Sequence, residues 1–302
     1  MSEPAIQQPA TTPPQPKKPS NLWMENFKNF YKKLRKNKAA MIGGFLILFF
    51  IIVAILGPFL TPHDPDTPDV VNKLQPPSAE HWFGTDHHGR DIFTRIIHGM
   101  SITLYVGFFS VILGATFGVL IGIVSGYYGG RTDSFLMRCM DVLLAFPGIL
   151  LALAIVSVLG GSLRNVIIAV AIFSIPVFAR IVRGSTLAVK KLEYVDAIKA
   201  LGASDIRIIF KHILPNVTSP LIVQATLSIA TAVLTAAGLS FLGLGAKPPT
   251  PEWGAMLSEG RNYLYSAPHV AFFPGIAIVL VVLAFNILGD GLRDALDPKM
   301  KK

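Results

Sequence analysis

The sequence predicts an all-α integral membrane protein with six transmembrane helices. Of its 302 residues 52% are hydrophobic and only 15% are charged, whereas soluble domains carry roughly 25% charged residues. The charges gather in the tails and in a few connectors, which leaves long stretches of the chain without any. The one cysteine, Cys139, has no partner for an internal disulfide, and no Cys/His set has the spacing of zinc ligands.

The lengths of the apolar stretches give the number of spans. A helix needs about 20 apolar residues to cross a hydrocarbon core of ~30 Å. Five stretches meet this requirement without an internal charge: residues 41–60, 101–125, 142–160, 217–244 and 270–289. A sixth stretch, residues 163–179, begins beside Arg164 and contains Pro176. We expect it to continue past Arg180, whose long side chain can reach the interface.

The remaining segments divide the chain further. Residues 1–20 are rich in Pro, Gln and Thr and predict a disordered tail, with no apolar core of a signal peptide. Residues 21–40 place apolar side chains at helical spacing among lysines, which predicts an amphipathic basic helix on the membrane surface. The first span and its outer loop then occupy residues 41–100, the transmembrane core residues 101–290, and a cytoplasmic tail residues 291–302.

Basic residues are distributed unevenly between the two sides of this arrangement. With the N-terminus inside, 21 of the 27 Lys and Arg residues lie on the inner side and 6 on the outer side. Because inner connectors carry an excess of Lys and Arg, both termini are predicted to be cytoplasmic. Topology therefore explains the net charge of +9, and nucleic-acid binding, which needs a basic face on a soluble fold, is not predicted.

Two long outer loops are expected, over residues 61–99 and 245–269. Each contains a tryptophan, Trp82 and Trp253, and both are expected at the headgroup surface, where the amphipathic indole ring is favoured.

Glycines recur at every fourth position of the second span, at Gly114, Gly118, Gly122 and Gly126, and Gly130 continues the spacing. At 3.6 residues per turn these glycines form one stripe, and such a stripe lets another backbone approach closely. The pattern predicts tight helix packing, either within this chain or against another subunit.

The spans lack ionisable residues almost entirely. Charges within a membrane are kept mainly for proton or ion pathways, so the sequence argues against a proton-coupled secondary transporter. It also lacks the phosphate-binding pattern G-x-x-x-x-G-K-[ST], and it shows no nucleophile–base pair or metal triad at membrane depth, as an intramembrane hydrolase would need. No catalytic residue and no bound cofactor are predicted.

The longest inner connector carries two short helical patterns on either side of Gly202. Tyr194, Ala197, Ile198 and Leu201 precede it, and Ile206, Ile209, Phe210 and Ile213 follow it. Glycine tolerates the positive φ of a sharp turn, and Pro215 either ends the second helix or begins the next span. Such a loop could present a rigid knob to a soluble partner, or it could be an interfacial helix pair without a partner.

This loop resembles the E-A-A-x3-G-x9-I-x-L-P loop of the permease subunits of ABC importers. The matching positions are Asp196, Ala197, Gly202, Leu214 and Pro215, while Ile198 replaces the second Ala and His212 the first Ile. Ala203, which follows Gly202 at an unspecified position of the motif, is expected to belong to the same ATPase-coupling loop. Asp196 keeps the carboxylate of the family's glutamate. Residues 83–91 (FGTDHHGRD), 239–257 and 285–299 are similar to C-type permeases of the dipeptide, oligopeptide and nickel importers, with dipeptide and glutathione importers nearest.

The resemblance implies a type I ABC importer permease in a bacterial or archaeal inner (plasma) membrane. It implies that this chain forms a pathway for dipeptides or oligopeptides with a B-type permease. Two ATPase subunits would bind ATP and Mg beneath them, the loop 193–215 would dock on an ATPase, and an extracytoplasmic binding protein would deliver substrate. Glutathione or a nickel chelate is the alternative cargo.

The outer histidines His81, His87 and His88 raise the possibility of a metal site, with Asp86 or Asp91 as further ligands. His87 and His88 fall at unspecified positions of the family pattern, and adjacent residues rarely point together. We therefore predict no metal site and a solvated loop in which Arg90 pairs with its acidic neighbours.

Overall fold

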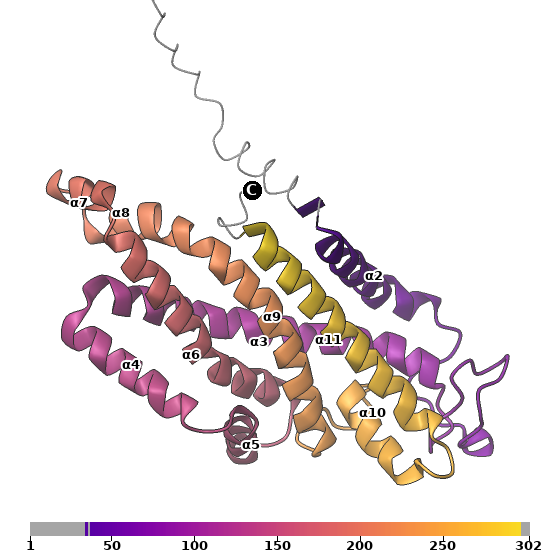
Figure 1. The fold of residues 1–302 in the computed structure, drawn as a ribbon. Coiled ribbons are helices and arrows are strands. Elements are labelled where there is room, and N and C mark those ends of the chain that lie inside the picture. Colours follow the sequence, from indigo (N-terminus) through magenta and orange to yellow (C-terminus); the bar gives the residue numbers. More distant parts are fainter. Residues whose placement is uncertain (1–33, 36, 297–302) are drawn as a thin grey trace, which may run out of the picture.

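The computed structural model describes residues 34–35 and 37–296, and this part of the chain is almost entirely helical (Figure 1). The predicted disordered tail and most of the predicted surface helix lie outside the described residues. Within the described residues, five helices are long and apolar enough to span a membrane: α2 (Lys38–Leu60), α3 (Ile92–Tyr128), α6 (Leu163–Lys190), α9 (Leu214–Phe241), which the preceding α8 and π turn extend back to Asp205, and α11 (His269–Leu296). The count becomes six if one bent pair, α4 and α5, forms a single span.

That bent pair replaces the continuous helix predicted over residues 142–160. α4 (Gly130–Leu144) and α5 (Gly148–Leu159) meet at a bend of 88°. Pro147 explains the break, because proline has no amide hydrogen to donate and disfavours helical geometry in the residue before it. With 12 residues, α5 is about 18 Å long, too short to cross a hydrocarbon core of ~30 Å alone.

Two other helix ends can be compared with the sequence prediction. α6 continues past Arg180 to Lys190, as predicted, and Arg180 donates a hydrogen bond to Asp141 on α4 at 2.7 Å. α11 runs to Leu296 and so includes the first residues of the predicted C-terminal tail.

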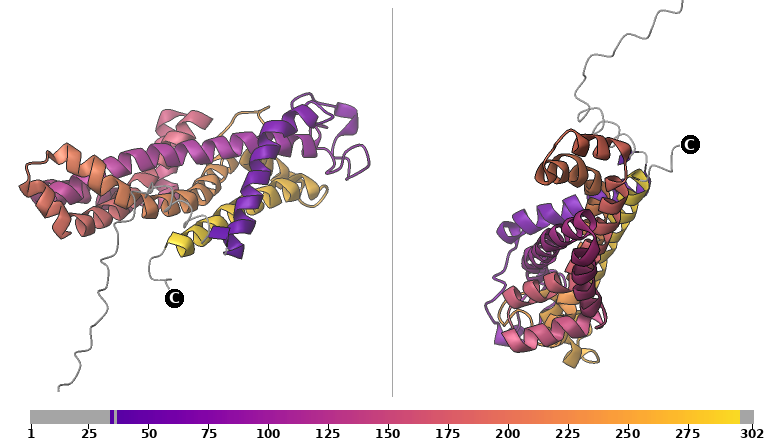
Figure 2. Two further views of the ribbon diagram at one scale, coloured as in Figure 1. Left: turned by 90° about the horizontal axis from the view of Figure 1, so that it is seen from above. Right: turned by 90° about the vertical axis from the view of Figure 1, so that its left-hand side faces the viewer.

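The helix α3 extends well beyond its predicted span. Its 37 residues give a length of about 55 Å. The helix begins at Ile92 beside the first long loop and ends at Tyr128 beside the loop that follows α6. One helix therefore connects the two ends of the molecule (Figures 1 and 2).

The short elements lie at these two ends. At one end lie α7 (Glu193–Ala200), α8 (Asp205–Ile208) and a π-helical turn, η2 (Ile209–Ile213). At the other end lie the 3-10 turns η1 (Val70–Asn72) and η3 (Arg261–Tyr263) and the helix α10 (Trp253–Gly260). Figure 1 shows this separation along the length of the bundle.

The buried apolar residues form two clusters. The larger cluster joins α2, α3, α5, α6, α9, α10 and α11 through the middle of the bundle. The smaller one lies at the α7–α8 end, where Val195, Ile208 and Ile213 pack with Ile123 of α3 and Val182 of α6. The loop after α6 is therefore packed on an apolar cluster that it shares with the ends of α3, α6 and α9.

Candidate functional site

The loop 193–215 is the candidate site, and Gly202 makes its turn. The φ of Gly202 is 82°, in the left-handed region where glycine is unstrained. The amide of Gly202 donates to the carbonyl of Lys199 at 3.0 Å, and that of Ala203 to the carbonyl of Ile198 at 3.3 Å. These two bonds form the Schellman motif that closes many helices.

Space within the chain does not require a glycine at this position. A methyl group at Gly202 would have no neighbouring atom within 4 Å. A larger residue would therefore disturb the backbone conformation at Gly202. It would also disturb any partner that contacts this surface.

Pro215 lies in the first turn of α9. Its ring crowds the carbonyl four residues earlier, and it has no amide to donate, so regular α-helical bonding fails just before it. The chain adopts a π turn there, in which the amide of Leu214 donates to the carbonyl of Ile209. Helical structure is continuous from Asp205 to Phe241, so Pro215 stands at a change of winding rather than at a break.

The apolar residues of the loop divide into a buried and an exposed set. Val195, Ile208 and Ile213 are buried against α3 and α6. Leu201, Ile206 and Phe210 point outward instead, with exposures of 87%, 70% and 63%. Exposed apolar patches are typical of surfaces that contact another protein or a membrane.

The six predicted site residues lie on both sides of this division. Asp196, Ala197, Gly202 and Pro215 are exposed, whereas Ala203 and Leu214 are half-buried against the smaller core. The helical pattern singled out Leu201, Ile206 and Phe210, but it did not indicate that they face away from the chain. Val195 and Ile208, which do hold the loop down, were missing from the pattern.

The glycine stripe of α3 lies against α6 within the same chain. A methyl group at Gly122 would lie 2.6 Å from the carbonyl oxygen of Ala179, and one at Gly126 would lie 2.8 Å from Cβ of Thr186. Gly114 and Gly118 likewise face residues 171–179 of α6. Gly130 does not join the stripe, because it has a positive φ at the start of α4 and open space around it.

The opposite end of the molecule contains a buried network of charges. Arg90 donates to Asp86 at 2.7 Å and to Glu259 at 3.1 Å. Arg95 is 1% exposed; it lies 3.6 Å from Asp86 and donates to the carbonyl of Pro249 at 3.2 Å. The network therefore joins the first long loop to the segment around α10.

The helix α3 begins inside this network. Asp91 caps it by accepting a hydrogen bond from the amide of Thr94 at 2.7 Å, and it also pairs with His81 at 3.0 Å. Trp253 is fully buried and donates to the carbonyl of Ile96 at 3.0 Å. Arg90 does pair with its neighbour Asp86, as predicted. The predictions of a solvated loop at these residues and of Trp253 at the headgroup surface are wrong, because contacts with distant parts of the chain bury Arg90 and Trp253.

Two groups of side chains at this end have metal-ligand types: His63 with His81 and Asp91, and Asp86 with His87 and Glu259. In the second group both carboxylates already pair with Arg90. Burial lowers the pKa of His87, so its ring is neutral at neutral pH. The absence of a metal site stays a prediction.

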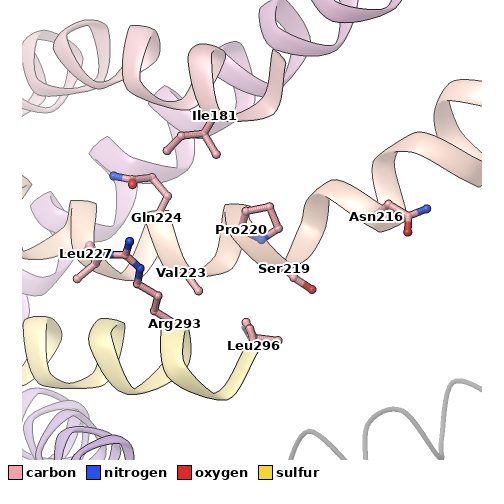
Figure 3. A pocket seen from close by; sticks show the side chains of 9 residues that line it. All are labelled: Ile181, Asn216, Ser219, Pro220, Val223, Gln224, Leu227, Arg293 and Leu296. Carbon is pink, nitrogen blue, oxygen red and sulfur yellow. The ribbon is translucent and has the colours of Figure 1, made fainter. Parts of the chain in front are cut away.

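A further cavity of about 640 Å³ opens between α6, α9 and α11, toward the α7–α8 end (Figure 3). Asn216, Ser219 and Gln224 of α9 supply polar groups, and Arg293 reaches from α11 toward Gln224 and Leu227. The cavity thus combines one cation with amides and a hydroxyl on a mainly apolar wall.

Two family models match the chain. Residues 118–302 match "binding-protein-dependent transport system inner membrane component", and residues 26–77 match "N-terminal TM domain of oligopeptide transport permease C". Together the two matches include both the loop 193–215 and the first span.

Similar proteins cover nearly the whole chain. A dipeptide transport system permease protein of Alkalihalophilus pseudofirmus is 53% identical over 279 residues, which are 92% of this chain and 90% of the relative. A glutathione transport system permease protein of Pectobacterium atrosepticum is 50% identical over 276 residues, or 91% and 92% of the two chains.

Solved structures show the same fold. An inward-facing methionine ABC transporter matches with a TM-score of 0.56 and 20% identity, over 68% of this chain and 98% of that one. An amino acid ABC transporter matches with a TM-score of 0.52 and 16% identity, over 66% and 92% of the two chains.

Proposed function

Because the chain belongs to the family of inner membrane components of binding-protein-dependent transport systems, we propose that it forms one half of a peptide pathway. The chain is a permease subunit of an ABC importer. In the proposed assembly a B-type permease forms the other half, and two separate ATPase subunits bind ATP and Mg and hydrolyse the ATP. An extracytoplasmic binding protein delivers the substrate.

Dipeptides or oligopeptides are the proposed cargo. The relative from A. pseudofirmus is named for dipeptide transport, and the match to residues 26–77 is named for oligopeptide transport. Relatives that are about as similar are named for glutathione transport, so glutathione is the alternative cargo, followed by a nickel chelate. The ligand that the accompanying binding protein retains distinguishes them.

One observation carries the proposed mechanism: the loop 193–215 presents an apolar surface, and its other side is packed on the smaller apolar cluster. Leu201 and Phe210 are exposed, and Val195 and Ile208 are buried beneath them. A loose loop would absorb the movement of a partner, whereas a packed loop passes it to the helices beneath. We propose that an ATPase subunit covers this surface, so that nucleotide-driven closure of the ATPases moves the spans.

This function requires a fixed orientation in the membrane. The excess of basic residues on one side supports a cytoplasmic position for both termini and for the loop 193–215. Single cysteines at Lys73 and Lys199 should react differently with an impermeant thiol reagent in intact cells. Labelling at position 199 without labelling at position 73 would reverse the orientation.

The docking role is tested with Gly202→Val. A β-branched residue at φ 82° costs about 1–3 kcal/mol in local strain and adds volume on the proposed contact surface. We expect normal insertion and retention of the B-type permease, but loss of the ATPase subunits during co-purification and loss of peptide uptake. Asp196→Lys should act in the same direction by reversing the charge beside this turn.

Gly243→Val is the matched control. Gly243 has a φ of 81°, and a methyl group placed on it would have no atom within 4 Å, but it lies after α9, away from the loop. This variant imposes the same backbone strain without touching the proposed contact. Wild-type uptake and co-purification in Gly202→Val would remove the loop from the mechanism.

A further inference from the structure

The last turn of α3 makes a specific contact with the loop 193–215. Tyr127 is 5% exposed, and its hydroxyl donates a hydrogen bond of 2.6 Å to Oδ1 of Asp205. Asp205 is the first residue of α8. The two residues are 78 positions apart in the sequence, so this hydrogen bond joins the loop to a helix that is not its neighbour along the chain.

Lys190 fixes the same tyrosine from the side of α6. Its Nζ donates to the carbonyl oxygen of Tyr127 at 2.5 Å and lies 5.5 Å from the centre of the Tyr127 ring. Lys190 is the last residue of α6. The ends of α3 and α6 and the start of α8 therefore meet at one side chain.

A second clamp holds α3, α4 and α6 together beside this point. Arg183 of α6 donates two hydrogen bonds of 2.6 Å to the two carboxylate oxygens of Asp133 on α4. Ser125 of α3 also donates to Asp133. Together with the close packing of Gly122 and Gly126 on α6, this clamp makes α3 and α6 a single stiff unit at this end.

The connection from the loop to α9 is of a different kind. It runs along the backbone through the π turn Ile209–Ile213, where helical winding is altered, and π turns often accompany functional sites. The loop is thus held to α3 by the hydrogen bond between Tyr127 and Asp205. The π turn lies between the loop and the rest of α9.

From this arrangement we propose that Tyr127 and Asp205 are positioning residues that carry movement of the loop into α3. The inference rests on the proposed docking of an ATPase at the loop. α3 then acts as a rod along the whole molecule, because its far end begins at Asp91 inside the buried charge network. Loop movement at the cytoplasmic end would thereby reach the outer end without passing through α9.

The test uses the complete importer reconstituted in lipid vesicles, with Tyr127→Phe as the main variant. This change removes one hydroxyl and keeps the ring that packs against Ile123 and Val182 in the smaller core. The readouts are co-purified ATPase subunits, substrate-stimulated ATP hydrolysis, and peptide transported per ATP hydrolysed. We expect the ATPases to remain bound and transport per ATP to fall about tenfold, as expected for a lost hydrogen bond to a charged group.

Two further variants sharpen this result. Tyr128→Phe is the matched control, because Tyr128 is the adjacent tyrosine but is 55% exposed; its transport per ATP should equal that of the wild type. Asp205→Ala removes the acceptor and should give the same loss as Tyr127→Phe. The double variant should be no worse than either single one, since both remove one interaction.

The outcomes separate this inference from the proposed function. Equal transport per ATP in Tyr127→Phe and Tyr128→Phe would overturn the proposal that the Tyr127–Asp205 pair carries loop movement into α3. Loss of the ATPase subunits from Tyr127→Phe would also overturn it, because the pair would then only shape the docking surface. If Gly202→Val transports normally, the docking proposal fails, whatever Tyr127→Phe does.

Discussion

The two ends of this permease differ in which side chains they bury and which they expose. At the end around α10, Arg90 and Arg95 are buried, and each pairs with carboxylates of the same chain: Arg90 with Asp86 and Glu259, and Arg95 with Asp86. At the loop 193–215, apolar side chains are exposed instead, among them Leu201 and Phe210. The buried charges of the first end are paired within the chain, whereas the second end presents an apolar surface that suits a partner.

The difference shows how one chain can separate stability from coupling. Buried charge pairs are intolerant of change, because removing one member leaves the other buried and unpaired. Exposed apolar residues contribute little to the fold of the isolated subunit, so they can be shaped for binding. α3 connects the two ends, with Asp91 at its start and Tyr127 at its last turn.

The largest expected effect on stability comes from breaking the buried charge network beside α10. Arg95→Ala leaves Asp86 with less compensating charge and removes the donor to the carbonyls of Pro65 and Pro249. We expect a loss of about 3–5 kcal/mol in the free energy of unfolding. Thermal unfolding of the purified subunit in detergent, followed by fluorescence, measures it.

Asp66→Asn is the control for this prediction. Asp66 also lies near Arg95, at 3.7 Å, but its side chain is 49% exposed, and such surface pairs contribute about 0–1 kcal/mol. A similar loss in both variants would mean that burial gives the charge network beside α10 no special weight in stability, and the comparison of the two ends would fail.

An intermediate effect is expected where α3 crosses α6 between the two ends. A methyl group in Gly118→Ala would press on Cβ of Phe178 and on the carbonyl of Ile175. Overpacking of this kind costs about 1–3 kcal/mol. Gly44→Ala is the control, because the nearest atom, on the side chain of Leu288, lies at an ordinary 3.8 Å. Equal melting temperatures for the two variants would show that the contact of the stripe with α6 is loose.

How far the sequence could predict the structure follows from the range of each interaction. Apolar length and glycine spacing are local signals, so the long helices and the stripe were predictable. The turn at Gly202, with its φ of 82°, was predictable for the same reason. The break between α4 and α5 also had a local signal in Pro147, which apolar length alone obscured.

The contacts that were missed are long-range. Arg90 reaches Glu259 across 169 positions, and Tyr127 reaches Asp205 across 78. A stretch of mixed charges such as residues 83–91 has the same composition whether it is solvated or buried. Only the fold brings Glu259 and the carbonyl of Pro249 to it. Likewise, the helical pattern of the loop 193–215 identified apolar residues without separating those that hold the loop from those that face away.

The smallest effect on stability, with a large effect on assembly, is expected at the tip of the loop. Leu201 is 87% exposed, so Leu201→Ser should change the free energy of unfolding by no more than about 0.5 kcal/mol. It should nevertheless reduce co-purification of the ATPase subunits, because a hydroxyl replaces an apolar contact on the proposed docking surface. Val71→Ser is the matched control at the opposite end of the molecule, where Val71 is 86% exposed; it should alter neither quantity. If Leu201→Ser retains the ATPases as well as Val71→Ser does, exposure of apolar residues at the loop marks no partner, and the contrast between the two ends reduces to one of stability alone.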